Sequence, residues 1–136
     1  MRYSVVAGRV LFSLLFVMAG FAHFSSQEIA VAASQGVPLA SIAVPISGIM
    51  AVLGGLSIAL GYKARWGAAL IILFLIPVTI MMHNFWSVSD PMRLQIEKAM
   101  FLKNVTMLGG ALVISYFGAG PLSVDALISQ GKRLIP

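Results

Sequence analysis

Four long apolar runs dominate the pattern of hydrophobic and polar positions along the chain. They cover residues 3–24, 39–60, 66–82 and 99–117, and the strongly polar side chains are nearly confined to their ends. A membrane-spanning helix needs about 20 mostly apolar residues. The pattern therefore predicts an all-α integral membrane protein, a four-helix bundle that forms a single transmembrane domain over residues 1–136.

The segments between the runs differ in length and character. Residues 61–65 predict a tight hairpin between the second and third runs, and residues 25–37 leave room for a short surface helix. The tripeptide Ser-Asp-Pro at 89–91 is typical of a helix start, with Pro91 at the first helical position. We therefore expect the fourth helix to begin near residue 91, outside the hydrocarbon.

Composition supports lipid as the solvent of this chain. Of the 136 residues 60% are hydrophobic and 10% are charged, whereas a soluble domain carries about 25% charged residues. The absence of cysteine excludes disulfides, thiol catalysis and Cys-ligated metal centres. The net charge of +5 does not indicate a nucleic-acid partner, because the basic residues are scattered near the ends of the apolar runs.

The distribution of basic residues predicts the orientation. With four spans, both termini and the 61–65 hairpin lie on one side, which carries six basic residues against three on the other. Basic residues favour the cytoplasmic side, so we predict a multi-pass protein with both termini cytoplasmic. Arg9 is expected to reach the cytoplasmic head groups. In an alternative interpretation the first run is a cleaved signal peptide, with residues 20–22 as its cleavage site.

A weak internal repeat relates the two halves of the chain. The first and third runs end in His23 and His83, and the second and fourth contain the tripeptide Leu-Gly-Gly at 53–55 and 108–110. The pattern is consistent with two pseudo-equivalent helical hairpins. Small residues also form a seam on the second run and are expected to let helices pack closely, as are Gly109 and Gly110 on the fourth. The seam residues are Gly48, Ala51, Gly55 and Ala59.

Several stretches, in order, resemble the DoxX family of small four-span membrane proteins. They are residues 8–11 (GRVL), 19–24 (AGFAHF), 53–55 (LGG), 103–110 (KNVTMLGG) and 118–125 (GAGPLSVD). The resemblance implies a four-helix bundle in the bacterial cytoplasmic (inner) membrane. It also implies an association with redox complexes, including one in which quinone is the electron acceptor. Members of this family often have lysine where His23 stands.

The candidate site is the set of polar and aromatic residues that up-and-down threading brings to the end opposite the termini. Polar groups near hydrocarbon are costly unless paired or hydrated, so such a cluster is a functional hypothesis. In it Lys103, His83 and His23 polarise or protonate a bound carbonyl group. The residues expected to bind the ligand are Asn84, Trp86, Asn104 and Glu97.

Other interpretations of these residues remain open. His23 and His83 are also candidates for a haem or metal pair, a weaker hypothesis because no fixed ligand spacing supports it. In the structural interpretation both histidines lie half hydrated at the membrane–water interface, and Lys103 extends to the membrane surface. Asn84 and Asn104 then form hydrogen bonds between helices. All four acidic residues lie outside the apolar runs, and no paired catalytic carboxylates or nucleophilic triad are evident.

Two functions follow from these observations. The first is a redox-associated membrane subunit that binds a quinone or similar amphipathic molecule, as a subunit of a quinone-linked oxidoreductase would. The alternative is a non-enzymatic membrane anchor or assembly subunit of a partner complex. The expected partners are the lipid bilayer, membrane or periplasmic redox proteins, and further copies of the chain.

Overall fold

The computed structural model describes residues 2–133, with side chains as far as residue 131, so Lys132 and Arg133 of the charge balance have no described side chain. Four helices are long and apolar enough to cross a membrane. This confirms the prediction of an all-helical protein with four spanning helices, and the described residues contain no strand. In chain order the helices are α1 (Arg2–Ala22), α2 (Ser26–Ser34), α3 (Ala40–Leu60), α4 (Ala64–Met82), the 3-10 helix η1 (Phe85–Ser87), α5 (Pro91–Phe117) and α6 (Val124–Arg133).

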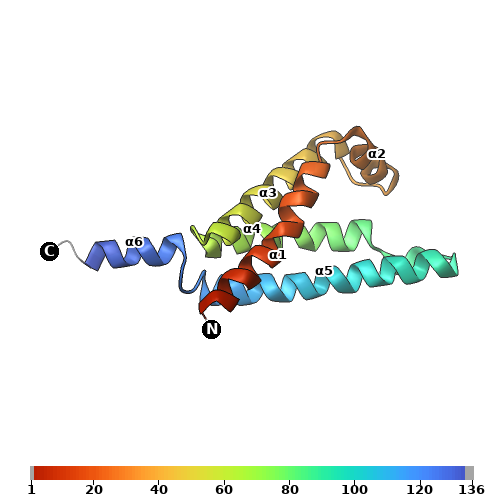
Figure 1. Ribbon diagram of the computed structural model, residues 1–136. Coiled ribbons are helices and arrows are strands. Elements are labelled where there is room, and N and C mark those ends of the chain that lie inside the picture. Colours follow the sequence, from red (N-terminus) through yellow and green to blue (C-terminus); the bar gives the residue numbers. More distant parts are fainter. Residues whose placement is uncertain (1, 134–136) are drawn as a thin grey trace.

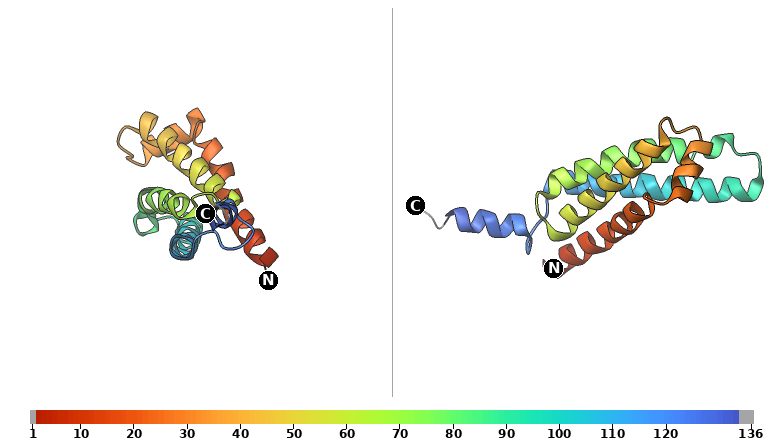
Figure 2. Two further views of the ribbon diagram at one scale, coloured as in Figure 1. Left: turned by 90° about the vertical axis from the view of Figure 1, so that its left-hand side faces the viewer. Right: turned by 90° about the horizontal axis from the view of Figure 1, so that it is seen from above.

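The spanning helices pack in the order α1, α3, α4, α5, and the two outer helices α1 and α5 hardly touch each other. In Figure 1, α1 crosses the bundle obliquely, and α2 lies beside the start of α3 at one end. Both Figure 1 and Figure 2 show α6 projecting beyond the opposite end, where the N-terminus lies. We call this second end the basic end, and the end where α1 and α4 finish and α5 begins the histidine end.

Small residues let the helices approach closely. A Cβ added to Gly20 of α1 would lie 2.8 Å from the carbonyl oxygen of Gly48 on α3, and one on Gly55 would lie 3.2 Å from that of Ser13. The predicted packing seam on the second run is therefore confirmed. The expectation for Gly109 is wrong, because nothing in the described chain lies within 4 Å of the place its Cβ would take.

The start of α5 follows from local chemistry. Asp90 is the N-cap residue, and its Oδ1 accepts a hydrogen bond from the backbone N–H of Arg93 at 2.7 Å. Pro91 occupies the first turn, where its missing N–H has no helical partner in any case. Together these residues begin the helix at residue 91, well before its most apolar part.

The basic end is held together by Arg9, which is only 5% exposed. Its Nη1 donates to the carbonyl of Ala119 at 2.5 Å, and its Nη2 donates to the carbonyl of Leu122 at 3.0 Å. The expectation that Arg9 reaches the lipid head groups is therefore wrong. The segment after α5 folds back against α1 and presents its carbonyl oxygens to the guanidinium.

Asp125 ties the same segment to the turn between α3 and α4. Its two carboxylate oxygens accept hydrogen bonds from the backbone N–H groups of Lys63 at 2.8 Å and Ala64 at 3.2 Å. The backbone N–H of Asp125 in turn donates to the carbonyl of Gly61 at 2.9 Å. The carboxylate therefore caps the start of α4, where the N–H groups of a helix lack partners.

Candidate functional site

A cavity of about 150 Å³ lies at the histidine end, between α1, α4 and α5. Four of the seven predicted site residues line it, together with an apolar wall. Threading the helices up and down predicts that these four share one end of the molecule, and the structure brings them around one space. The polar residues are His23, His83, Lys103 and Asn104, and the apolar ones are Leu15, Phe16, Ala19, Phe74, Leu75, Val78 and Met107.

His23 directly follows α1, and its orientation is fixed by the end of that helix. Its Nδ1 lies 2.6 Å from the carbonyl oxygen of Ala19. Since a carbonyl oxygen can only accept, Nδ1 carries the proton and donates. The ring also packs edge-on against Phe74, with centroids 5.6 Å apart. The atom that His23 has left for a ligand is therefore Nε2.

His83 ends α4 and pairs with Glu97 of α5. The distance between His83 Nδ1 and Glu97 Oε2 is 2.8 Å, and both side chains are about one-fifth exposed. Glu97 also lines a separate polar pocket of about 290 Å³ at the surface. The pair therefore stands between the cavity, which His83 lines, and a more polar space outside it.

Asn104 is the most constrained polar residue of the cavity. It is 3% exposed, and its side chain makes no hydrogen bond to any other described residue. The side-chain atoms that are fully buried without a partner in the described chain are Arg9 Nε and Ser13 Oγ, so the Asn104 amide keeps a small exposure at the cavity. Lys103 is exposed, and its ammonium contacts Met100 Sδ at 3.3 Å, so it contributes to the edge of the cavity.

Three predicted residues do not line the cavity: Glu97, which contacts it only through His83, and two residues of the segment after α4. Trp86 is 59% exposed and packs edge-on against Phe85 and Phe101, with ring centroids 5.3 and 5.8 Å away. Asn84 lines the surface pocket beside Glu97. Both belong to the short segment around η1, for which Asn84 is the N-cap residue.

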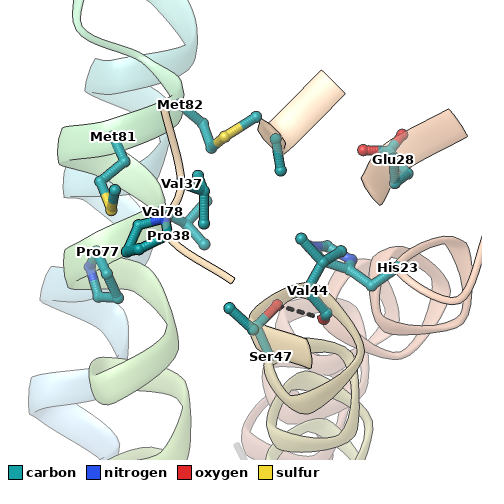
Figure 3. A pocket seen from close by; sticks show the side chains of 12 residues that line it. His23, Glu28, Val37, Pro38, Val44, Ser47, Pro77, Val78, Met81 and Met82 are labelled. Atoms are coloured by element: carbon teal, nitrogen blue, oxygen red, sulfur yellow. Dashed lines mark hydrogen bonds between the residues drawn. The ribbon is translucent and has the colours of Figure 1, made fainter. Parts of the chain in front are cut away.

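An apolar cleft of about 210 Å³ adjoins the cavity, and sequence reasoning missed it. Figure 3 shows Val44 and Ser47 of α3 on one side and Pro77, Val78 and Met81 of α4 on the other. The proline and methionines near the end of the third run were the only available signal. His23 and Val78 line both the cleft and the cavity, so the two spaces meet at these side chains.

The geometry does not favour the haem or metal hypothesis for His23 and His83. Within residues 2–133 no three His, Cys, Asp or Glu side chains gather as metal ligands would. A cavity of about 150 Å³ is the size that holds one benzene ring in another protein, so a porphyrin would not fit inside it. The space suits a head group of one ring or smaller.

This chain shares sequence with several known proteins, among them one from yeast and two from Escherichia coli. It is 33% identical over 72 residues to the ER-derived vesicles protein ERV29 of Saccharomyces cerevisiae, a match that covers 53% of this chain but only 23% of the yeast protein. It is 24% identical to the inner membrane protein YqjF of Escherichia coli, over 93% of each chain. It is 26% identical to the inner membrane protein YphA of the same organism, over 89% of this chain and 87% of that one. No solved structure matches the chain.

The family comparison corrects the resemblance described above. The sequence profile that matches is that of the SURF4 family, over residues 1–130. The assignment to the DoxX family is therefore wrong, and the redox association that this resemblance implied loses its support. This chain belongs to the SURF4 family.

Proposed function

We propose that this membrane protein binds a small amphipathic molecule at its histidine end. The polar head of the ligand occupies the cavity, and its apolar part lies in the adjoining cleft between α3 and α4. The observation that carries the proposal is Asn104, a buried amide that lines the cavity and has no hydrogen-bond partner in the described chain. A ligand that paired with this amide would supply the hydrogen bonds that the described chain does not.

The polar groups around the cavity suit a carbonyl or carboxylate head. The Asn104 amide donates and accepts, the Nε2 atoms of His23 and His83 are left over from their Nδ1 contacts, and Lys103 adds a positive charge at the edge. The cavity holds a head of about one ring, and the cleft adds about 210 Å³ of mostly apolar space. A quinone with a short tail and a medium-chain fatty acid both belong to this class, and the proposal assigns no redox chemistry to either.

The test is binding to the purified protein in mild detergent, with a short-chain ubiquinone and decanoate as probes. Wild type is compared with Asn104→Leu and with Asn84→Leu, the same substitution outside the cavity. We expect at least one probe to bind wild type and Asn84→Leu alike and to bind Asn104→Leu roughly tenfold more weakly. Equal affinity for all three proteins would show that the cavity is not part of the binding site.

We also propose the inner membrane as the location, with the basic end in the cytoplasm. The two bacterial relatives that align over nearly their whole length are named as inner membrane proteins, and six basic residues against three support the orientation. Because the chain has no cysteine, single cysteines at Ser89 and Ser129 can be labelled from outside with an impermeant maleimide. We expect the Ser89 variant to be labelled and the Ser129 variant to be protected. The opposite result would mean that the protein has the reverse orientation.

An assembly subunit is the second candidate, and the exposure of α5 supports it. Only 11% of its spanning segment is buried, against 22–33% in the other three spans. In that case a partner protein or a second copy of the chain covers α5, and the protein should tolerate Lys103→Ala without loss of function. Site-specific crosslinking from Val113, which is 58% exposed on α5, would capture that partner in membranes and would yield only lipid adducts if the helix faces lipid.

A further inference from the structure

A second pocket, of about 370 Å³, lies at the basic end, far from the candidate ligand cavity. The start of α4, the end of α5 and the start of α6 enclose it. Two basic side chains and two large aromatic ones form much of its wall. The residues that matter here are Lys63, Arg65, Trp66, Phe117, Gly118 and Asp125.

The pocket has an excess of positive charge. No carboxylate in the described chain forms an ion pair with Lys63 or Arg65. Asp125 is close, but both its oxygens accept hydrogen bonds from backbone N–H groups at the start of α4, and it also acts electrostatically on Arg9. Lys63 and Arg65 therefore line a pocket whose single carboxylate is already engaged. Lys63 Nζ lies 5.7 Å from the Tyr62 ring centroid, a contact that leaves its charge uncompensated.

The aromatic side chains place this pocket at the level of the lipid head groups. Trp66 is 75% exposed, and Tyr116 and Phe117 at the end of α5 are 75% and 73% exposed. Exposed tryptophan and tyrosine at the ends of spanning helices typically lie at the membrane–water interface. A lipid of the surrounding membrane can therefore reach the pocket along the protein surface.

An apolar groove leads from this pocket into the hydrocarbon. It measures about 490 Å³ and follows the seam where α1 and α5 hardly touch, past Gly8 and Val113. The groove and the pocket share Phe117, Gly118 and Ala119 as lining residues. The basic end thus combines a cationic pocket at head-group depth with space for a hydrocarbon chain directly beside it.

From this combination we infer that the basic end binds an anionic phospholipid. The phosphate lies between Lys63 and Arg65, and an acyl chain lies in the groove between α1 and α5. An arginine binds phosphate through two parallel hydrogen bonds, and basic pockets between spanning helices are known to hold anionic head groups. This site is independent of the ligand cavity, because the two share no lining residue.

The test compares lipids retained by purified protein in native mass spectrometry. The protein is exchanged into equal amounts of dioleoyl phosphatidylglycerol and dioleoyl phosphatidylcholine. We expect wild type to retain the anionic lipid at least fivefold over the zwitterionic one. Lys63→Gln/Arg65→Gln should lose that preference. The control Arg93→Gln/Lys98→Gln removes two positive charges at the other end and should keep it.

A second variant tests the groove without touching the charges. Gly8 lines the groove and has nothing within 4 Å of its Cβ position, so the side chain of Gly8→Leu starts in open space and extends into the groove. It should lower lipid retention severalfold while Lys63 and Arg65 remain. Equal preference in wild type and Lys63→Gln/Arg65→Gln would overturn the proposal. Displacement of the lipid by millimolar inorganic phosphate would also overturn it, because the site would then recognise a free anion.

Discussion

Replacing Asn104 by leucine should change stability and ligand affinity in opposite directions. The residue is 3% exposed, lines the cavity and has no hydrogen-bond partner in the described chain. Leucine has a similar shape and removes a mostly buried amide that makes no hydrogen bond in the described chain. The amide keeps a small exposure at the cavity, because the fully buried unpaired side-chain atoms of the described residues are Arg9 Nε and Ser13 Oγ, so the low end of the cost of an unpaired group applies. We therefore expect Asn104→Leu to raise the free energy of unfolding of the ligand-free protein by about 1 kcal/mol.

The same change should weaken the bound state. An amide that pairs with a ligand makes about two hydrogen bonds, each with a net contribution of about 0.5–1.5 kcal/mol. Losing both lowers the affinity roughly 5- to 150-fold. At a ligand concentration of 100 times the wild-type Kd, wild type gains about 2.7 kcal/mol, whereas a variant with a Kd about 100-fold higher gains about 0.4 kcal/mol. The difference in free energy of unfolding between the two proteins should therefore shrink or change sign when ligand is added.

Denaturant titration in mixed micelles, with and without the probe, measures both effects on the same samples. Asn84→Leu is the matched control, because Asn84 lies at the same end of the molecule but outside the cavity. If Asn104→Leu destabilises the ligand-free protein by more than about 1 kcal/mol, then Asn104 has a partner in the native protein. The argument for a ligand head in this cavity would then lose its basis.

Three further substitutions test the contacts at the two ends. Glu97→Gln keeps an oxygen acceptor for His83 but removes the charge, so the free energy of unfolding should fall by about 1 kcal/mol; no change would mean that the pair is not formed. Gly61→Ala should lower the free energy of unfolding by more than about 2 kcal/mol, because Gly61 has φ +67° and the new Cβ would lie 2.8 Å from Arg9 Nη1. The control is Gly36→Ala, where φ is +81° but the Cβ would meet open space, and it should lower the free energy of unfolding by only about 1–2 kcal/mol. Arg9→Met leaves two carbonyl oxygens without donors, so amide hydrogen exchange over residues 118–125 should accelerate about tenfold, and unchanged exchange would contradict the role assigned to Arg9.

Structural features with a local cause could be predicted from the sequence, and features with a long-range cause could not. The length of the apolar runs and the cap at Asp90 are local properties, and they predicted the spanning helices and the start of α5. The position of Arg9 depends on a carbonyl 110 residues away, which no local pattern shows. Trp86 and Asn84 were expected in the cavity because the fold of the short segment around η1 could not be derived from hydrophobicity.

The family resemblance failed for a related physical reason. The stretches that suggested DoxX, such as residues 53–55 (LGG) and 118–125 (GAGPLSVD), are rich in small residues. Close helix packing and tight turns require such residues in many membrane proteins. In this structure Gly55 packs against α1, and Gly118 and Gly120 adopt positive φ. Stretches of this kind therefore reflect packing and turn geometry and do not identify one family.

The distribution of close contacts explains why the candidate cavity lies where it does. Gly20 and Gly48 bring the backbones of α1 and α3 together, and Gly54 and Gly67 do the same for α3 and α4. No comparable backbone contact holds α5, whose spanning segment is the least buried of the four. At the basic end the folded-back segment after α5 compensates through its hydrogen bonds to Arg9. At the histidine end the His83–Glu97 pair joins α4 to α5, but α1 and α5 hardly touch, so the space between α1, α4 and α5 can stay open there.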